Sequence, residues 1–370
     1  MFVPVNQPDL SGNEKKYLCE CIDSGWISSE GPFVKRFERE MANLCNREYG
    51  VAVANGSVAL DTAVMALGIG AGDEVIMPVF TIISCAAAVV RVGAKPVFVD
   101  ADPLTWNMNT DKIEAKISNR TKAIMVVHIY GLPTDMQPVL ELAKKYNLKI
   151  IEDAAEAHGQ TYNNQPCGSF GDISTFSFYP NKHVTCGEGG MVLTNDEVLA
   201  NRCRDIRNLF FDSERRYIHS ELGYNFRMTN LQAAVGCAQL ERLAETVLRK
   251  RTIGEKYHDL LRGVKSIQLP LERTDYAENI YWVYGLILAD ECKYGAVELL
   301  KALGERGVQC RHFFYPLHRQ PGLTNYFDYH AENYPVADRL AKQGLYLPSG
   351  VGLLVEQQQY VCEQLKAVLN

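Results

Sequence analysis

Short apolar runs alternate with amphipathic stretches from about residue 49 of this 370-residue chain. The apolar runs predict strands at 49–54, 73–78, 95–100, 122–131, 148–153, 171–179 and 189–195. Between the first two, Leu60, Ala63, Val64 and Leu67 lie on one helical face, and 135–147 is a second helical stretch. Strands that are apolar throughout and alternate with helices predict an α/β fold with a mainly parallel sheet covered on both faces.

The pattern changes near residue 229. Thr229 and Gln232 have the spacing of a capping box, and apolar positions then follow one helical pattern as far as Leu260. A strand-like run at 280–288 and helical stretches near 295–306 and 355–369 come after it. We therefore predict a large domain over 1–245 and a smaller α+β domain over 246–370.

Composition and charge exclude several classes of partner. The net charge is −6 and the basic residues are scattered, which disfavours nucleic acid and anionic membrane surfaces. No apolar run approaches the roughly 20 residues that span a bilayer, and residues 1–16 lack the pattern of a signal peptide. Eleven cysteines without a CxxC pair, and eight dispersed histidines, predict a reduced cytoplasmic protein with no metal site.

Three candidate chemical groups each follow a predicted strand. The Asn55-Gly56-Ser57 turn opens a helix, whose free N–H groups suit a phosphate, although an ordinary connection has the same pattern. Asp153 ends a very apolar strand, where a carboxylate needs a partner unless it is a simple helix cap. Ser177 stands five residues before Lys182, a lone lysine followed by a glycine-rich stretch at 187–190.

A lysine in a loop is usually a solvated charge, but these three groups together match one cofactor. Pyridoxal 5'-phosphate needs donors for its phosphate, a carboxylate beside its pyridine nitrogen and an amine for a Schiff base. The combination predicts an enzyme that binds this cofactor through Lys182. The glycines then permit a tight turn beside the cofactor.

The chain resembles the DegT/DnrJ/EryC1/StrS group of fold-type I, aspartate-aminotransferase-like enzymes, which aminate nucleotide-linked keto sugars. The resemblance is carried by GWISSEGPFVKRFE, NGSVAL, PVFVDADPLTWN, VVHIYG, IEDAAEAHG, FSFYPNKHVTCGEGGM, GYNFRMTN, FFYPLH and LPS. It implies glutamate as amino donor, and the TCGEGGM run favours GDP-4-keto-6-deoxymannose as acceptor. It also implies a homodimer with shared active sites and a role in lipopolysaccharide O-antigen synthesis.

The resemblance also assigns roles to individual residues. Lys182 would carry the Schiff base and move the proton, Asp153 would pair with the pyridine nitrogen, and Asn225 would reach the phosphate from the partner subunit. The other expected cofactor contacts are Gly56, Ser57, Val58, Ile82, Glu156 and Ser177. The expected substrate contacts are Trp26, Ser28, Ser29, Arg227, Tyr315 and His318, for which packing roles stay equally open.

Ile82 departs from the family pattern, because relatives usually stack an aromatic residue on the pyridine ring there. The sequence leaves the nucleotide, the hexose and amination at C3 or C4 open. A related 3-dehydratase would have histidine in place of Lys182, and a non-catalytic regulator would have lost Lys182 or Asp153. A nicotinamide-dependent oxidoreductase would need a GxGxxG turn where this chain has only Asn-Gly-Ser.

Overall fold

A seven-stranded sheet forms the centre of the larger part of the protein. The structure, a computed structural model, describes residues 1–212, 214–215, 217–329 and 331–369. The strands of this sheet are β1 (Tyr49–Val53), β9 (Gly190–Thr194), β8 (Ile173–Ser177), β5 (Lys149–Asp153), β4 (Thr121–Val127), β2 (Glu74–Pro78) and β3 (Lys95–Val99), in that spatial order. All neighbours pair in parallel except β9, which is antiparallel to both β1 and β8. The prediction of a mainly parallel sheet is therefore confirmed.

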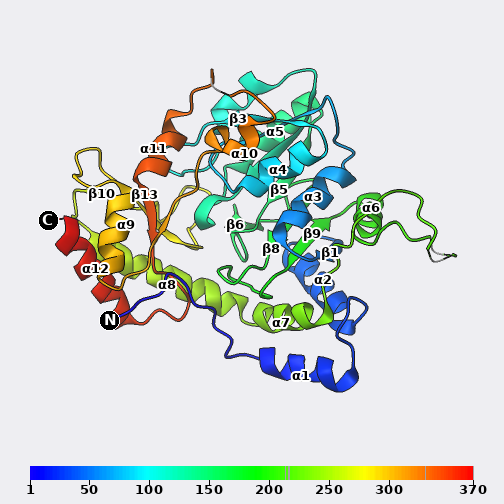
Figure 1. Ribbon diagram of the computed structural model, residues 1–370, viewed down its shortest axis with the longest axis horizontal. Coiled ribbons are helices and arrows are strands. Elements are labelled where there is room, and N and C mark those ends of the chain that lie inside the picture. Colours follow the sequence, from blue (N-terminus) through cyan, green and yellow to red (C-terminus); the bar gives the residue numbers. More distant parts are fainter. Residues whose placement is uncertain (213, 216, 330, 370) are drawn as a thin grey trace.

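Helices cover both faces of this sheet (Figure 1). They are α2 (Pro32–Leu44), α3 (Gly56–Ala66), α4 (Ile83–Arg91), α5 (Met136–Tyr146), α6 (Glu197–Arg207) and α7 (Asn230–Leu240), and α1 (Glu14–Ser24) packs on α7. In β1, Val51 and Val53 pack with α3 and α4, whereas Ala52 packs with α2 and α7 on the opposite face. Since alternate residues of a strand face opposite ways, a strand covered on both sides must be apolar throughout.

The C-terminal part has its own antiparallel sheet and core. Its strands are β10 (Ile267–Gln268), β11 (Tyr284–Leu288), β13 (Gly344–Leu347) and β12 (Arg311–His312), in that order. Its helices are α8 (Leu243–Leu261), α9 (Ala296–Glu305), α10 (Pro321–Thr324), α11 (Pro335–Gln343) and α12 (Val355–Leu369). Two short strands outside both sheets, β6 (Thr161–Tyr162) and β7 (Gln165–Pro166), pair with each other. The N-terminus also lies here, where Val3 forms a bridge with Val308 (Figure 1). The boundary at residue 245 stays a prediction.

Three predicted elements differ from the observed ones. The single long helix after Thr229 is two helices, and its capping box is confirmed. The break at 241–242 lets Glu241 accept from Tyr17 and lets Arg242 pair with Asp9, contacts that an apolar pattern does not reveal. Two strands are shorter than predicted: β4 ends at Val127 and β11 begins at Tyr284.

The shorter strands have a backbone cause. Tyr130 and Tyr281 have φ values of 57° and 48°, in the left-handed region, which interrupts regular strand geometry. Within the described residues, no helix combines the length and apolar composition needed to cross a membrane.

Candidate active site

A cavity of about 710 Å³ opens where the central strands end and the C-terminal part meets them. The start of α3, the ends of β5 and β8 and the loop bearing Lys182 line it, and Trp282, Arg311 and Tyr346 close it from the C-terminal part. The structure brings together these residues of the predicted site: Gly56, Ser57, Val58, Ile82, Asp153, Glu156, Ser177 and Lys182.

Lys182 presents its amine to this cavity. Its Nζ lies 3.7 Å from Glu156 Oε1 and 3.5 Å from the centroid of the Trp282 ring. Burial lowers the pKa of Lys182, although the charges of Glu156 and Asp153 oppose the shift. The side chain is only 10% exposed, so this is not a solvated surface lysine. A buried amine with a lowered pKa can lose its proton and act as a nucleophile.

Asp153 is the last residue of β5 and is almost fully buried. Its Oδ1 accepts from the Ala155 amide at 3.0 Å and its Oδ2 from the Cys85 thiol at 3.3 Å. Burial raises the pKa of Asp153 in spite of these bonds. Among the described residues the carboxylate thus has no cationic partner in hydrogen-bond contact, which suits a group that stabilises a protonated ring nitrogen.

Glu156 lies between the lysine and a strained backbone segment. Its Oε2 accepts from the Tyr130 amide at 2.8 Å, and burial raises the pKa of Glu156 to about 7. Tyr130 holds the left-handed conformation that aims this amide, and its hydroxyl accepts from the Phe314 amide at 3.1 Å. A costly backbone conformation beside a carboxyl group that lines a cavity is typical of functional sites.

The first turn of α3 forms an anion-binding corner. Asn55 caps this helix by accepting from the Val58 amide at 3.1 Å, so the Val58 N–H is already used. The amides of Gly56 and Ser57 precede the first intrahelical hydrogen bonds and remain available to a phosphate. A Cβ at residue 56 would lie 2.5 Å from the Ser177 Cβ, so only glycine permits Ser177 to approach this turn. The Ser57 and Ser84 hydroxyls are 2.8 Å apart beside it.

These residues fit pyridoxal 5'-phosphate. The corner at α3 offers donors for the phosphate, Asp153 a carboxylate and Lys182 an amine, all in one cavity. The Thr175 hydroxyl also lines the cavity and is buried without a hydrogen-bond partner among the described residues. A buried polar atom of this kind is normally satisfied by a water or a ligand.

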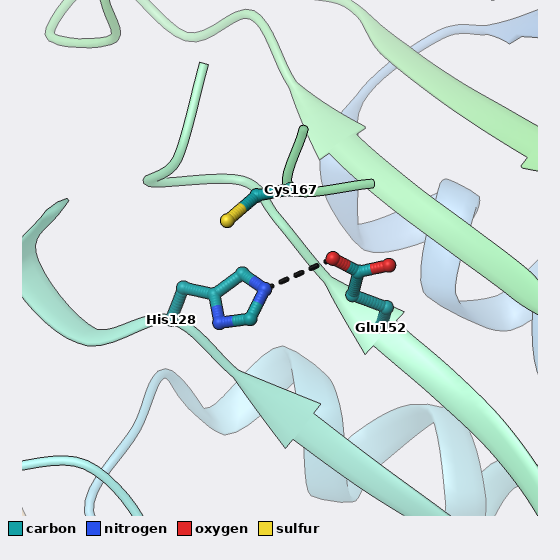
Figure 2. A group of neighbouring side chains, drawn as sticks. All are labelled: His128, Glu152 and Cys167. Atoms are coloured by element: carbon teal, nitrogen blue, oxygen red, sulfur yellow. Dashed lines mark hydrogen bonds and ion pairs between the residues drawn. The ribbon is translucent and has the colours of Figure 1, made fainter. Parts of the chain in front are cut away.

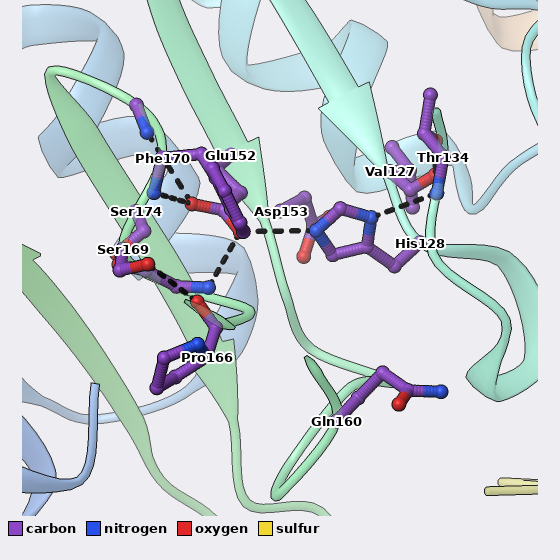
Figure 3. Close-up of polar contacts among 12 residues, drawn as sticks. Val127, His128, Thr134, Glu152, Asp153, Gln160, Pro166, Ser169, Phe170 and Ser174 are labelled. Carbon is purple, nitrogen blue, oxygen red and sulfur yellow. Dashed lines mark hydrogen bonds and ion pairs between the residues drawn. The ribbon is translucent and has the colours of Figure 1, made fainter. Parts of the chain in front are cut away.

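A second polar cluster, which does not line the cavity, surrounds Glu152, next to Asp153. His128 Nε2 lies 3.0 Å from Glu152 Oε1, and Cys167 is close to both (Figure 2). His128 Nδ1 accepts from the Thr134 amide, which leaves the Nε2 proton for Glu152 (Figure 3).

Glu152 accepts further bonds from the amides of Gly168 and Phe170. Burial raises the pKa of Glu152, but the His128 and backbone bonds outweigh it, and the pKa is lowered. Although His128, Glu152 and Cys167 have the spacing of metal ligands, these bonds already use both imidazole nitrogens and both carboxylate oxygens. The cluster joins β4 and β5 to the loop at 166–171.

The structure does not bring the other predicted residues into this cavity. Asn225 is exposed, and Arg227 donates to Asn208, although Phe226 between them reaches the cavity. The remaining predicted substrate residues, Trp26, Ser28, Ser29, Tyr315 and His318, also lie outside it. Trp26 and Ser28 accept from Asn230 through their carbonyls, next to the segment 223–229, and Tyr315 is exposed. His318 is buried against Tyr334, with Asp338 at 3.5 Å, and burial lowers its pKa.

Sequence reasoning missed several residues of the cavity, namely Ser84, Asn181, Trp282, Arg311 and Tyr346. Ser84 and Asn181 lie close to the predicted contacts Ile82 and Lys182, so these loops could have indicated them. Trp282, Arg311 and Tyr346 come from the C-terminal part, and no local pattern in the sequence marks them.

Comparison with known proteins finds full-length similarity. A family model described as the DegT/DnrJ/EryC1/StrS aminotransferase family matches residues 8–366. Two similar proteins are both named GDP-perosamine synthase. The one from Escherichia coli O157:H7 is 44% identical over 366 residues, 98% of each chain, and the one from Vibrio cholerae is 39% identical over 372 residues, 100% of each. A crystal structure of DesV from S. venezuelae has a TM-score of 0.91 at 33% identity and covers 100% of this chain and 99% of that one.

Proposed function

Because the chain belongs to the DegT/DnrJ/EryC1/StrS aminotransferase family, we propose that it transfers the amino group of glutamate to a nucleotide-linked 4-keto-6-deoxyhexose. Family membership confirms the expected fold type I and the cofactor, pyridoxal 5'-phosphate. The relatives named GDP-perosamine synthase support GDP-4-keto-6-deoxymannose as acceptor. The products are then the 4-amino-4,6-dideoxy sugar nucleotide and 2-oxoglutarate.

The observation that carries the proposal is the meeting of Lys182, Asp153 and the α3 corner in one cavity. When bound, pyridoxal phosphate supplies the electron sink through which an amino and a keto group exchange. The Gly56 and Ser57 amides and the Ser57 and Ser177 hydroxyls would hold its phosphate, and the Ile82 side chain would lie against its ring. An aliphatic side chain provides apolar contact there without aromatic stacking.

Asp153 would keep the ring nitrogen of the cofactor protonated. Its buried carboxylate gains a cationic partner when the cofactor binds, which removes the cost of holding an unpaired charge at the end of β5. Lys182 would hold the cofactor through its amine and, when that amine is free, would carry the proton that the exchange requires. Burial raises the pKa of Glu156 to about 7. This carboxyl group can therefore hold or release a proton near neutral pH without large cost.

The residues outside the cavity belong to a dimer in this proposal. Asn225 and Arg227 flank Phe226 at the cavity edge, and Asn225 is exposed. We assign Asn225 to the cofactor phosphate of the partner subunit and Arg227 to the substrate diphosphate. We assign the remaining predicted substrate residues to the nucleotide sugar, namely Trp26, Ser28, Ser29, Tyr315 and His318.

Two assays test the reaction. Purified protein with pyridoxal phosphate and glutamate is incubated with GDP-4-keto-6-deoxymannose and with UDP- and dTDP-linked 4-keto and 3-keto sugars. We expect the GDP-linked 4-amino sugar and 2-oxoglutarate, and Lys182→Ala is expected to abolish both. Turnover of a UDP or dTDP sugar without any product from the GDP sugar contradicts the proposed acceptor. Near-normal turnover by the alanine variant contradicts the role of Lys182.

A mixing experiment tests the shared site. Lys182→Ala and Asn225→Ala chains are co-expressed, so that about half of randomly paired dimers are mixed and each contains one site with both native residues. About a quarter of wild-type sites should then return. Activity no greater than that of the two variants assayed separately shows that both residues serve the same chain's site.

A further inference from the structure

The indole ring of Trp282 lies directly against the reactive amine. Lys182 Nζ is 3.5 Å from the ring centroid, and Trp282 is only 6% exposed. The nearest ion-pair contact of the amine, to Glu156 Oε1, is 3.7 Å long, beyond ordinary hydrogen-bond distance. The ring face is therefore a principal contact of the amine, and the Lys182 side chain is only 10% exposed.

Trp282 is held rigidly in this position. Its Nε1–H donates to the Asn181 carbonyl at 2.8 Å, which ties the ring to the residue before Lys182. Its own carbonyl accepts from the buried Lys250 amine at 2.9 Å. Gly131 approaches the backbone of Trp282 so closely that a Cβ at residue 131 would lie 2.6 Å from the Trp282 backbone nitrogen. The ring is held by one hydrogen bond and the backbone of Trp282 by two further contacts, so this residue can define where the amine rests.

An aromatic face attracts a cation through its quadrupole, and the attraction is strongest where water is excluded. We propose that the Trp282 face is the resting place of the Lys182 amine whenever that amine is not bonded to the cofactor, and that it holds the amine there as an ammonium ion. The proposal rests on the proposed function only for the bond between Lys182 and the cofactor. Trp282 is thus a positioning residue that keeps a transferable proton beside the reacting atoms.

The other influences on the amine shift its pKa in opposite directions. The titratable groups that face it are Asp153, Glu156, Cys85, His158 and His183, with Tyr346 and Arg311 across the cavity. The carboxyl groups favour the ammonium ion, whereas burial favours the neutral amine. The contribution of the ring must therefore be measured by changing the ring alone.

The test uses cofactor-free protein and fluorinated tryptophans placed at residue 282, which weaken the quadrupole but keep the ring shape and the N–H donor. The same series at Trp106, a buried tryptophan that does not line the cavity, is the matched control. The rate at which a small acylating reagent labels Lys182, followed by peptide mass spectrometry from pH 6 to pH 10, reports the pKa of the amine.

We expect the acid dissociation constant of Lys182 to rise stepwise with fluorination at 282, by about tenfold for the most fluorinated ring, and to stay constant in the Trp106 series. Trp282→Leu should give a similar rise. A flat series at residue 282 overturns the proposal even if Trp282→Leu does not fold. Since labelling needs neither cofactor nor turnover, such a failure is distinct from an active Lys182→Ala variant, which contradicts the proposed function instead.

Discussion

Replacing Gly131 by alanine tests how closely the two parts of the protein are packed at the active site. Gly131 has a φ of +99°, and an added Cβ would lie 2.6 Å from the Trp282 nitrogen and 2.9 Å from the Tyr281 nitrogen. Both contacts are backbone atoms, which cannot rotate away as a flexible side chain can. The methyl group must therefore displace the segment 280–282 or the loop that follows β4.

The expected cost has two parts. An alanine in the left-handed region costs about 1–2 kcal/mol relative to glycine. Inserting a methyl group into a packed site adds about 1–3 kcal/mol. Gly187→Ala is the matched control, because Gly187 has a φ of +79° but no atom within 4 Å of the added Cβ. We expect a loss of about 2–5 kcal/mol for Gly131→Ala and about 1–2 kcal/mol for Gly187→Ala.

Urea-induced unfolding of the cofactor-free proteins, followed by circular dichroism and tryptophan fluorescence, measures both losses. The two signals must coincide for the free energies to be compared. If the two variants lose the same free energy within about 0.5 kcal/mol, the close approach of Gly131 to Trp282 is not what limits this position.

Three further predictions concern the buried carboxyl groups. Asp153→Asn should lower turnover by at least about 100-fold while the protein remains folded, because the ring nitrogen loses its anionic partner. Glu156→Gln should lower turnover much less. Equal losses of turnover in the two variants contradict their separate roles. Glu156 has a pKa of about 7 instead of 4.5, so the folded state holds its proton more tightly than the unfolded state. The stabilisation from this proton is fully present below pH 4.5 and is lost as the pH rises to about 7. Glu156→Gln should therefore flatten the pH dependence of the unfolding free energy of the cofactor-free protein between these two pH values. Parallel curves of unfolding free energy against pH for the variant and the wild type refute this. His128→Leu should lower the free energy of unfolding by about 2–4 kcal/mol, because Glu152 stays buried without its imidazole donor. A chelator should leave the urea midpoint of the wild-type protein unchanged. A lowered midpoint points to a bound metal.

Most of the sheet and much of the cofactor site could be predicted from the sequence. The apolar runs of β1, β2, β3 and β5 are recognisable because strands covered on both faces exclude polar residues wherever they are packed. Asp153 and Lys182 could be singled out because each stands beside such a strand, and Gly56 because it opens a helix. These signals are local, since the residues that carry them are neighbours along the chain.

The rest of the active site is formed by contacts between segments that are distant in the sequence. Trp282 and Tyr346 reach the cavity that holds Lys182 only because the C-terminal sheet packs over the ends of the central strands, and their own neighbours in the sequence look like ordinary strand residues. The pKa of Glu156 is likewise set by burial and by the Tyr130 amide, whose left-handed backbone cut short a strand predicted to reach residue 131. Apolar periodicity describes which side of an element is buried, whereas the partner that buries it, and the electrostatic environment that results, are decided only when the chain is folded.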